Sequence, residues 1–177
     1  MSIKFRIVSQ KDDFVEYLSD SSKHIIHYSD LQPYWTYANT DEQEGVSIRL
    51  QDNLLVCIML TASTQGGIIF VWDCKQHKLL HISDGSYTYA ALVHDDSVYG
   101  LRVVSNFVTP AHFVLSKSAF GTMDAYTDAE IVNCKFTCDV DAFDGDFDHI
   151  GLLHNQGQFI MDVNSNKYVI NMNEAES

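Results

Sequence analysis

The densest group of chemically active side chains is a run of five aspartates in ten residues, with no lysine or arginine among them. The five are Asp139, Asp141, Asp144, Asp146 and Asp148. A calcium-binding EF-hand loop needs oxygen ligands at positions 1, 3 and 5, glycine at position 6 and glutamate at position 12. Placing Gly145 at position 6 puts Val140, Ala142 and Gly151 at positions 1, 3 and 12. The EF-hand motif therefore fails, and a calcium site of looser form stays an alternative.

The alternation of residues in this run has a second interpretation. In an extended chain Asp144, Asp146 and Asp148 share one face, while Phe143 and Phe147 share the other. Such a stripe of carboxylates either is a solvated acidic loop or faces a partner that supplies cations. From residue 124 to residue 148 there are eight acids and one base. We therefore predict that the five aspartates form a partner-binding surface.

An aromatic group, Tyr34, Trp35 and Tyr37, precedes the acidic residues Asp41, Glu42 and Glu44. Large aromatic side chains are typical of the energetic centre of protein interfaces. Trp35 and Tyr37 are accordingly predicted to be apolar anchors for the same partner. The alternative is that these rings belong to the core.

The other reactive side chains predict neither catalysis nor a cofactor or metal site. Cys134 and Cys138 are four residues apart, which on a strand is about 13 Å, too far for a disulfide or a two-cysteine metal clip. None of the eight histidines follows a recognisable nucleophile motif, and Gly66-Gly67 lacks the Lys-Ser/Thr of a phosphate loop. We expect a protein that is not an enzyme, although a catalytic histidine assembled from distant strands stays an alternative.

The composition excludes several classes of partner. The 177 residues include 11 Lys and Arg against 24 Asp and Glu, a formal net charge of −13. This charge disfavours nucleic acid and anionic membrane surfaces, which need clustered bases. The longest apolar run, Leu54 to Leu60, is too short to span a bilayer, and the N-terminus lacks a signal-peptide core. With four irregularly spaced cysteines, the sequence favours a cytoplasmic location.

The elements that would position these residues are mostly short strands. Runs of β-compatible residues separated by Gly, Asn and Asp turns predict an all-β fold of antiparallel meander sheets over residues 46–177. Residues 1–45 form an N-terminal segment: a strand over 3–7, a short helix capped by Ser9, a strand over 24–28 and the aromatic group. Phe14, Val15 and Leu18 give the apolar face of that helix. We predict one domain, 1–177.

A weak internal repeat refines this prediction. Phe70, Asp73 and Lys78 recur 89 residues later as Phe159, Asp162 and Lys167, each set around a strand, a polar turn and a second strand. A third apolar run at 113–115 falls between them, so the repeat is about 44 residues long. Repeats of this length are typical of four-stranded propeller blades.

The pair Trp72-Asp73 resembles the dipeptide that ends the third strand of a WD-type β-propeller blade, with residues 75–78 as its polar turn. The resemblance implies an incomplete, half-propeller-like array of antiparallel sheets. The chain departs from the family because it lacks the upstream Gly-His pair and has Leu115-Ser116 and Met161-Asp162 in the later units. A β-sandwich with recurring hairpins is the alternative.

In composition and size the chain is similar to immunity proteins of interbacterial toxin systems, such as contact-dependent growth inhibition. That resemblance implies an inhibitor that occupies the basic active-site cleft of a nuclease toxin with Asp and Glu. Two alternatives remain: a metal-dependent hydrolase using residues 139–148, or a scaffold that homodimerises through exposed sheet edges.

Overall fold

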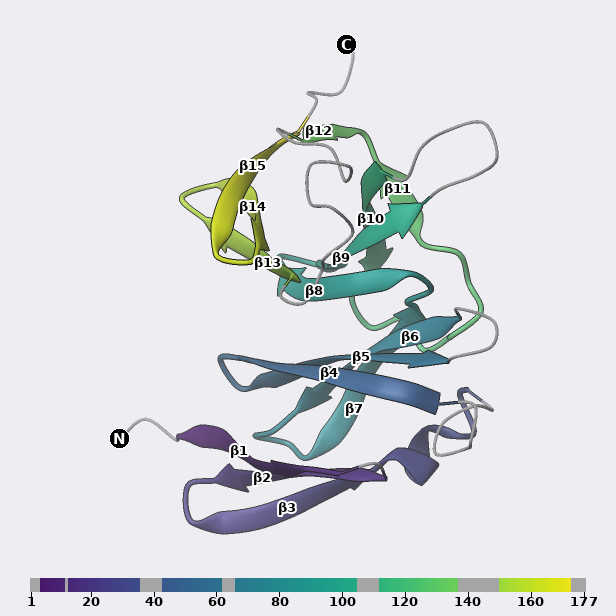
Figure 1. Cartoon of the computed structure of the whole chain (residues 1–177). Coiled ribbons are helices and arrows are strands. Elements are labelled where there is room, and N and C mark those ends of the chain that lie inside the picture. Colours follow the sequence, from purple (N-terminus) through teal and green to yellow (C-terminus); the bar gives the residue numbers. More distant parts are fainter. Residues whose placement is uncertain are drawn as a thin grey trace. The chain divides into compact units, whose positions relative to one another are not determined.

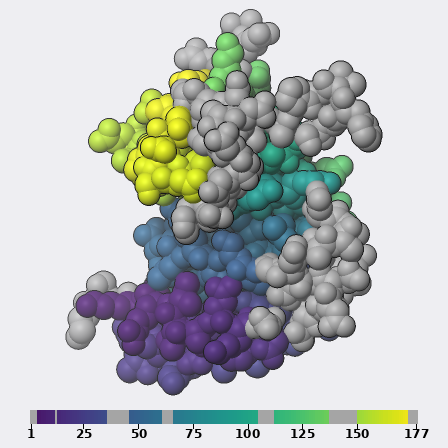
Figure 2. Space-filling model, viewed as in Figure 1, coloured from purple at the N-terminus to yellow at the C-terminus, as the bar shows by residue number. Residues whose placement is uncertain are grey.

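The computed structural model is built almost entirely of antiparallel strands (Figure 1). It describes residues 4–11, 13–35, 43–61, 66–104, 112–136 and 150–172; the others are grey in Figure 1 and Figure 2. The chain divides into two compact units. Unit 1 comprises Met1–Ser86 and Phe120–Asp128, and unit 2 comprises Tyr87–Ala119 and Ala129–Ser177. Four antiparallel open sheets confirm the prediction of an all-β meander fold.

Unit 1 contains two sheets. The first has the order β1 (Phe5–Gln10), β2 (Phe14–Ser19), β3 (Ser22–His27), and the second the order β4 (Gln43–Gln51), β5 (Leu54–Thr61), β6 (Gly67–Asp73), β7 (Lys78–Asp84). Every strand pairs with its neighbour in sequence, as in a meander. A single 3-10 turn, η1 (Tyr28–Leu31), follows β3.

The predicted N-terminal helix is wrong, because Phe14–Ser19 is strand β2. The spacing of Phe14, Val15 and Leu18 fits a helix, but Val15 and Tyr17 are the residues that are buried, with the period of two that a strand requires. Asp20 adopts φ 55° in a two-residue turn, which brings Ser19 opposite Ser22. This tight hairpin pairs β2 with β3 and overrides the helical spacing.

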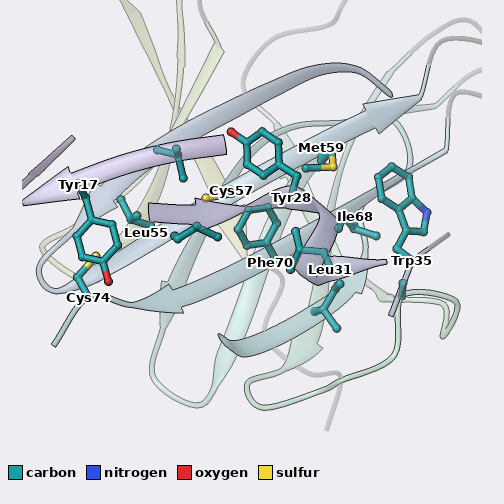
Figure 3. Close-up of a cluster of buried hydrophobic side chains, with 14 residues drawn as sticks. Tyr17, Tyr28, Leu31, Trp35, Leu55, Cys57, Met59, Ile68, Phe70 and Cys74 are labelled. Atoms are coloured by element: carbon teal, nitrogen blue, oxygen red, sulfur yellow. The ribbon is translucent and has the colours of Figure 1, made fainter. Parts of the chain in front are cut away.

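The apolar core of unit 1 lies between its two sheets (Figure 3). The first sheet and its 3-10 turn contribute Tyr17, Ile26 and Tyr28, and the second contributes buried side chains of β5 and β6 such as Met59 and Phe70. Tyr17 and Cys74 lie at one end of this cluster and Trp35 lies at the other (Figure 3). The core therefore joins the first 35 residues to the sheet that follows them.

One segment of unit 1 comes from much later in the chain. Phe120–Asp128 lies between β10 and β11 in sequence but belongs to unit 1. Met123 forms a parallel bridge with Ile82 of β7, supported by backbone hydrogen bonds from Ile82 to Thr122 (2.7 Å) and from Asp124 to Ile82 (3.0 Å). Ala125 is buried in the core of unit 1. The segment thus extends the edge of β7 and closes part of the core.

Unit 2 contains two four-stranded sheets. One has the order β11 (Glu130–Val132), β10 (His112–Ala119), β9 (Ser97–Val104), β8 (Thr88–His94), and the other the order β12 (Cys134–Phe136), β15 (Asn166–Met172), β14 (Gln158–Val163), β13 (Ile150–Asn155). A second core, which includes Leu101, Leu115 and Met161, packs between them. Asn133 separates β11 from β12, and these two strands join different sheets.

The internal repeat has a structural basis in its turns. β6, the third strand of its sheet, ends at Asp73 as predicted, and Asp73 lies opposite Lys78 just as Asp162 lies opposite Lys167. Each aspartate accepts backbone N–H groups of the turn that follows it, from Lys75 (2.8 Å) in unit 1 and from Ser165 (3.0 Å) in unit 2. The third predicted unit differs, because Leu115-Ser116 lies in the middle of β10.

Candidate functional site

The predicted partner-binding residues fall into two groups. Asp139, Asp141, Asp144, Asp146, Asp148 and Tyr37 lie outside the described residues, and so does Cys138. Trp35 is described, and its side chain is 3% exposed within the core of unit 1. That position fits the core role considered for this ring. A contact between Trp35 and a partner stays a prediction.

The acidic run is attached to a defined part of the fold. β12 ends at Phe136 and β13 begins at Ile150, and these two strands form opposite edges of one sheet in unit 2. With β15 and β14 between them, the edges are about 14 Å apart at ordinary strand spacing. The segment of sequence that carries the aspartates therefore follows one edge strand of this sheet and precedes the other.

Negative charge is concentrated in one part of the sequence. Residues 124–148 hold eight acids and one base, a net charge of −7 out of the −13 of the whole chain. Five of these acids are the aspartates of 139–148.

Many acids of the described sheets have a structural role. Asp73, which is 6% exposed, accepts hydrogen bonds from the backbone N–H groups of Lys75 and Gln76 and from Nδ2 of Asn53. Four more accept hydrogen bonds from backbone N–H groups at or beside turns: Asp20, Asp84, Asp124 and Asp162. Hydrogen bonds from Thr127 and the Tyr126 backbone lower the pKa of Asp124. Such carboxylates stabilise turns, as short polar side chains commonly do.

A group of histidine and aromatic side chains joins the two sheets of unit 1. The rings of His24 on β3 and His77 in the turn after β6 stack with centroids 3.7 Å apart and planes 23° apart. Tyr17 on β2 stacks beside both rings, and its hydroxyl lies 2.7 Å from Nδ1 of His77. Trp72 donates its Nε1–H to the same hydroxyl oxygen at 2.9 Å. We name these four residues, Tyr17, His24, Trp72 and His77, the histidine junction.

Unit 2 contains a second histidine stack. His94 at the end of β8 and His154 on β13 have centroids 3.7 Å apart and planes 25° apart. Phe159 packs edge-on against both rings, and Tyr99 packs against Phe159. Nε2 of His94 lies 3.3 Å from a carboxylate oxygen of Asp95.

The sequence does not indicate either stack. His24 and His27, or His77 and His81, are close in sequence, whereas the stacked partners are 53 and 60 residues apart. No spacing rule for a single strand or turn connects such residues, because their meeting depends on which strands pair and which sheets pack. Only the three-dimensional fold identifies them.

Neither the cysteines nor the histidines assemble a reactive centre in the part of the chain that the structure describes. Burial raises the pKa of the Cys74 thiol to about 12 and raises the pKa values of Cys57 and Cys134 above their usual range. These thiols are therefore protonated at neutral pH and are poor nucleophiles. Among the described residues, no three His, Cys, Asp or Glu side chains are grouped in a way that would hold a metal ion.

Comparisons with known proteins give no further assignment: no family model, no curated protein and no solved structure matches the chain. Within the described residues, no helix has the length and hydrophobicity needed to cross a membrane.

Proposed function

We propose that this chain is a binding protein for a basic protein partner, and in its most concrete form an immunity protein that neutralises a nuclease toxin. The observation that carries the proposal is the concentration of charge in the sequence: residues 124–148 hold eight acids and one base, more than half of the net −13. Five described aspartates accept backbone N–H groups at or beside turns, which gives these five a structural role. The five aspartates at 139–148 are the densest group of acids in the sequence.

A nuclease must present Lys, Arg and His to the phosphates of its substrate. Carboxylates that occupy the same cleft compete with those phosphates, and complementary charge accelerates association. The acidic run lies in sequence between β12 and β13, which are the two edge strands of one sheet. A cytoplasmic location belongs to the same proposal, since an inhibitor must meet its toxin where the substrate is. The metal-dependent hydrolase and the homodimeric scaffold stay alternative predictions.

The test compares two variants of equal charge. In the first, Asp144, Asp146 and Asp148 are each replaced by Asn; in the second, the exposed residues Asp13, Asp30 and Asp128 are replaced in the same way. Each tagged protein is used to capture host proteins at low salt, and the nuclease activity of the captured fraction is titrated with the free protein.

The wild type and the second variant are expected to capture a basic nuclease and to inhibit it. The first variant is expected to inhibit at least tenfold more weakly and to depend less on salt, since removing one partner of a buried charge pair costs about 2–5 kcal/mol. Equal inhibition by both variants would place the binding surface elsewhere. Failure of the wild type to capture or inhibit a nuclease would exclude the toxin-inhibitor function.

A further inference from the structure

The histidine junction lies at the tip of the β2–β3 hairpin. Tyr17 and His24 are directly opposite each other in the register of β2 and β3, close to the turn at Asp20. Across from them are Trp72 at the end of β6 and His77, which closes the next turn with φ 56°. These four side chains therefore connect the tip of one hairpin to the corner of the neighbouring sheet within unit 1.

All polar groups of the junction are satisfied when Nδ1 of His77 is unprotonated and accepts from the Tyr17 hydroxyl. An indole N–H can only donate, so the Tyr17 oxygen accepts from Trp72 and its own proton is available for Nδ1 of His77. Protonating Nδ1 would make that atom a donor as well. The Tyr17 proton would then lose its acceptor in a side chain that is 1% exposed, and an unsatisfied buried donor is unfavourable.

The stack adds a second reason. Two imidazolium rings at 3.7 Å repel each other, so protonation of both histidines opposes the stacked arrangement. The groups of the neighbouring turn supply little negative charge to balance two protonated histidines. Asp73, the acid closest in sequence on β6, accepts three hydrogen bonds from its own turn and from Asn53; Cys74 is a buried neutral thiol; Lys75 and Lys78 add positive charge to that turn.

On the first sheet, no charged residue is directly opposite Tyr17 in the strand register, apart from His24 itself if it is protonated. Ile7 of β1 pairs with Tyr17, while the adjacent row holds Arg6, Leu18 and Lys23. Lys23 lies 3.6 Å from Glu16 and so already has a counter-charge. Among the described residues, no carboxylate lies within ion-pair distance of His24 or His77.

We propose that the histidine junction is a proton-operated latch, which holds the tip of the β2–β3 hairpin against the turn between β6 and β7 at neutral pH and releases it at mildly acidic pH. Release is local, because the larger apolar contacts of Ile26, Tyr28 and Leu31 with the second sheet contain no titrating histidine. The latch concerns unit 1 and is independent of the proposed partner.

The pH range follows from His24. Burial, and then the neighbouring His77, lowers the pKa of His24 below its ordinary value of 6.5. A histidine with a lowered folded-state pKa binds its proton more readily once released. The latched state is therefore fully favoured above about pH 6.5 and loses its advantage as the pH falls from that value toward the folded-state pKa.

Amide hydrogen exchange of the full chain at pH 7.5 and pH 5.5, corrected for intrinsic rates, tests the latch. We expect protection of residues 17–24 to fall by up to about tenfold at pH 5.5, which is one pH unit below the ordinary pKa of histidine, while protection of residues 54–60 in β5 is unchanged. The matched variants are His24→Gln, which removes one ring of the stack, and His27→Gln, an exposed histidine of the same strand. His27→Gln should keep the pH effect and His24→Gln should abolish it.

The latch is excluded if residues 17–24 show no pH effect in the wild type, if His24→Gln shows the same effect, or if β5 loses protection equally. Should His24→Gln not fold, NMR titration of the wild-type histidines decides. Titration of His24 together with shifts of the hairpin-tip amides supports the latch, and titration without those shifts excludes it.

Discussion

The two units contain histidine stacks of nearly the same geometry in different surroundings. Both pairs have centroids 3.7 Å apart, with interplanar angles of 23° and 25°. In unit 1 the stack is fixed by hydrogen bonds, through the buried Tyr17 hydroxyl and the Trp72 indole. In unit 2 it is fixed by packing against Phe159, and a carboxylate of Asp95 lies beside His94.

The difference shows that ring geometry alone does not determine what a histidine pair does. In unit 1, an unprotonated Nδ1 of His77 can accept the Tyr17 proton, so protonation of that nitrogen acts against the arrangement. In unit 2, the ring contacts are apolar and a counter-charge is present. We therefore expect the stack of unit 2 to depend on its aromatic neighbour and the stack of unit 1 to depend on its hydrogen bonds.

The largest effect is expected from Phe159→Ala in unit 2. Phe159 is 5% exposed and contacts both histidines and Tyr99, so its removal leaves a cavity and should cost about 3–5 kcal/mol of the free energy of unfolding. Chemical denaturation measures the loss. Phe159→Leu is the control and should lose less than half as much. A loss below about 1 kcal/mol for the alanine variant would contradict the packing-based account of this stack.

Tyr17→Phe should have the next largest effect. The change removes one oxygen and leaves Nε1 of Trp72 and Nδ1 of His77 without their shared partner, at a cost of about 1–3 kcal/mol. Tyr99→Phe in unit 2 is the matched control and should change stability by less than about 0.5 kcal/mol. Denaturation of both variants at pH 7.5 makes the comparison. Equal losses would show that the hydroxyl of Tyr17 has no special role.

The smallest effect is expected at one of the two equivalent turns, the turn of unit 2. Asp73→Ala removes an acceptor of three hydrogen bonds from a nearly buried site and should cost about 1–3 kcal/mol. Asp162→Ala removes a more exposed carboxylate paired with Lys167 at 3.1 Å and should cost less than about 1 kcal/mol. Thermal unfolding measures both. A larger loss of stability for Asp162→Ala than for Asp73→Ala would contradict the expectation that the aspartate of the unit 1 turn contributes more.

The strands were predictable because their information is local. Apolar runs such as those in β5 and β6 and turn residues such as Asn164 and Ser165 determine short strands and tight connections without reference to distant residues. The helix prediction at Phe14 failed because pairing with β3 decided the conformation. The histidine stacks were not predictable at all, since each requires two strands more than 50 residues apart in the chain to come together.

The candidate partner site could also be predicted only in part from the sequence. The charge of residues 139–148 can be counted from the sequence alone. The structure shows in addition that the strands before and after this run, β12 and β13, are the two edges of one sheet. For Trp35, residue type alone left both a partner contact and a core position open, and its 3% exposure places the ring in the core. Burial depends on tertiary packing, which no single residue type encodes.

The position of Phe120–Asp128 affects how the protein is made. Unit 1 lacks the edge partner of β7 and the buried Ala125 until residue 128 has been synthesised, by which time β8, β9 and β10 are already available. The N-terminal unit therefore cannot finish folding before three strands of the next unit have been synthesised, in contrast to the usual domain-by-domain order on the ribosome. A gene cut after residue 86 would yield an incomplete fragment, and the two units have to be produced, and inherited, as one chain.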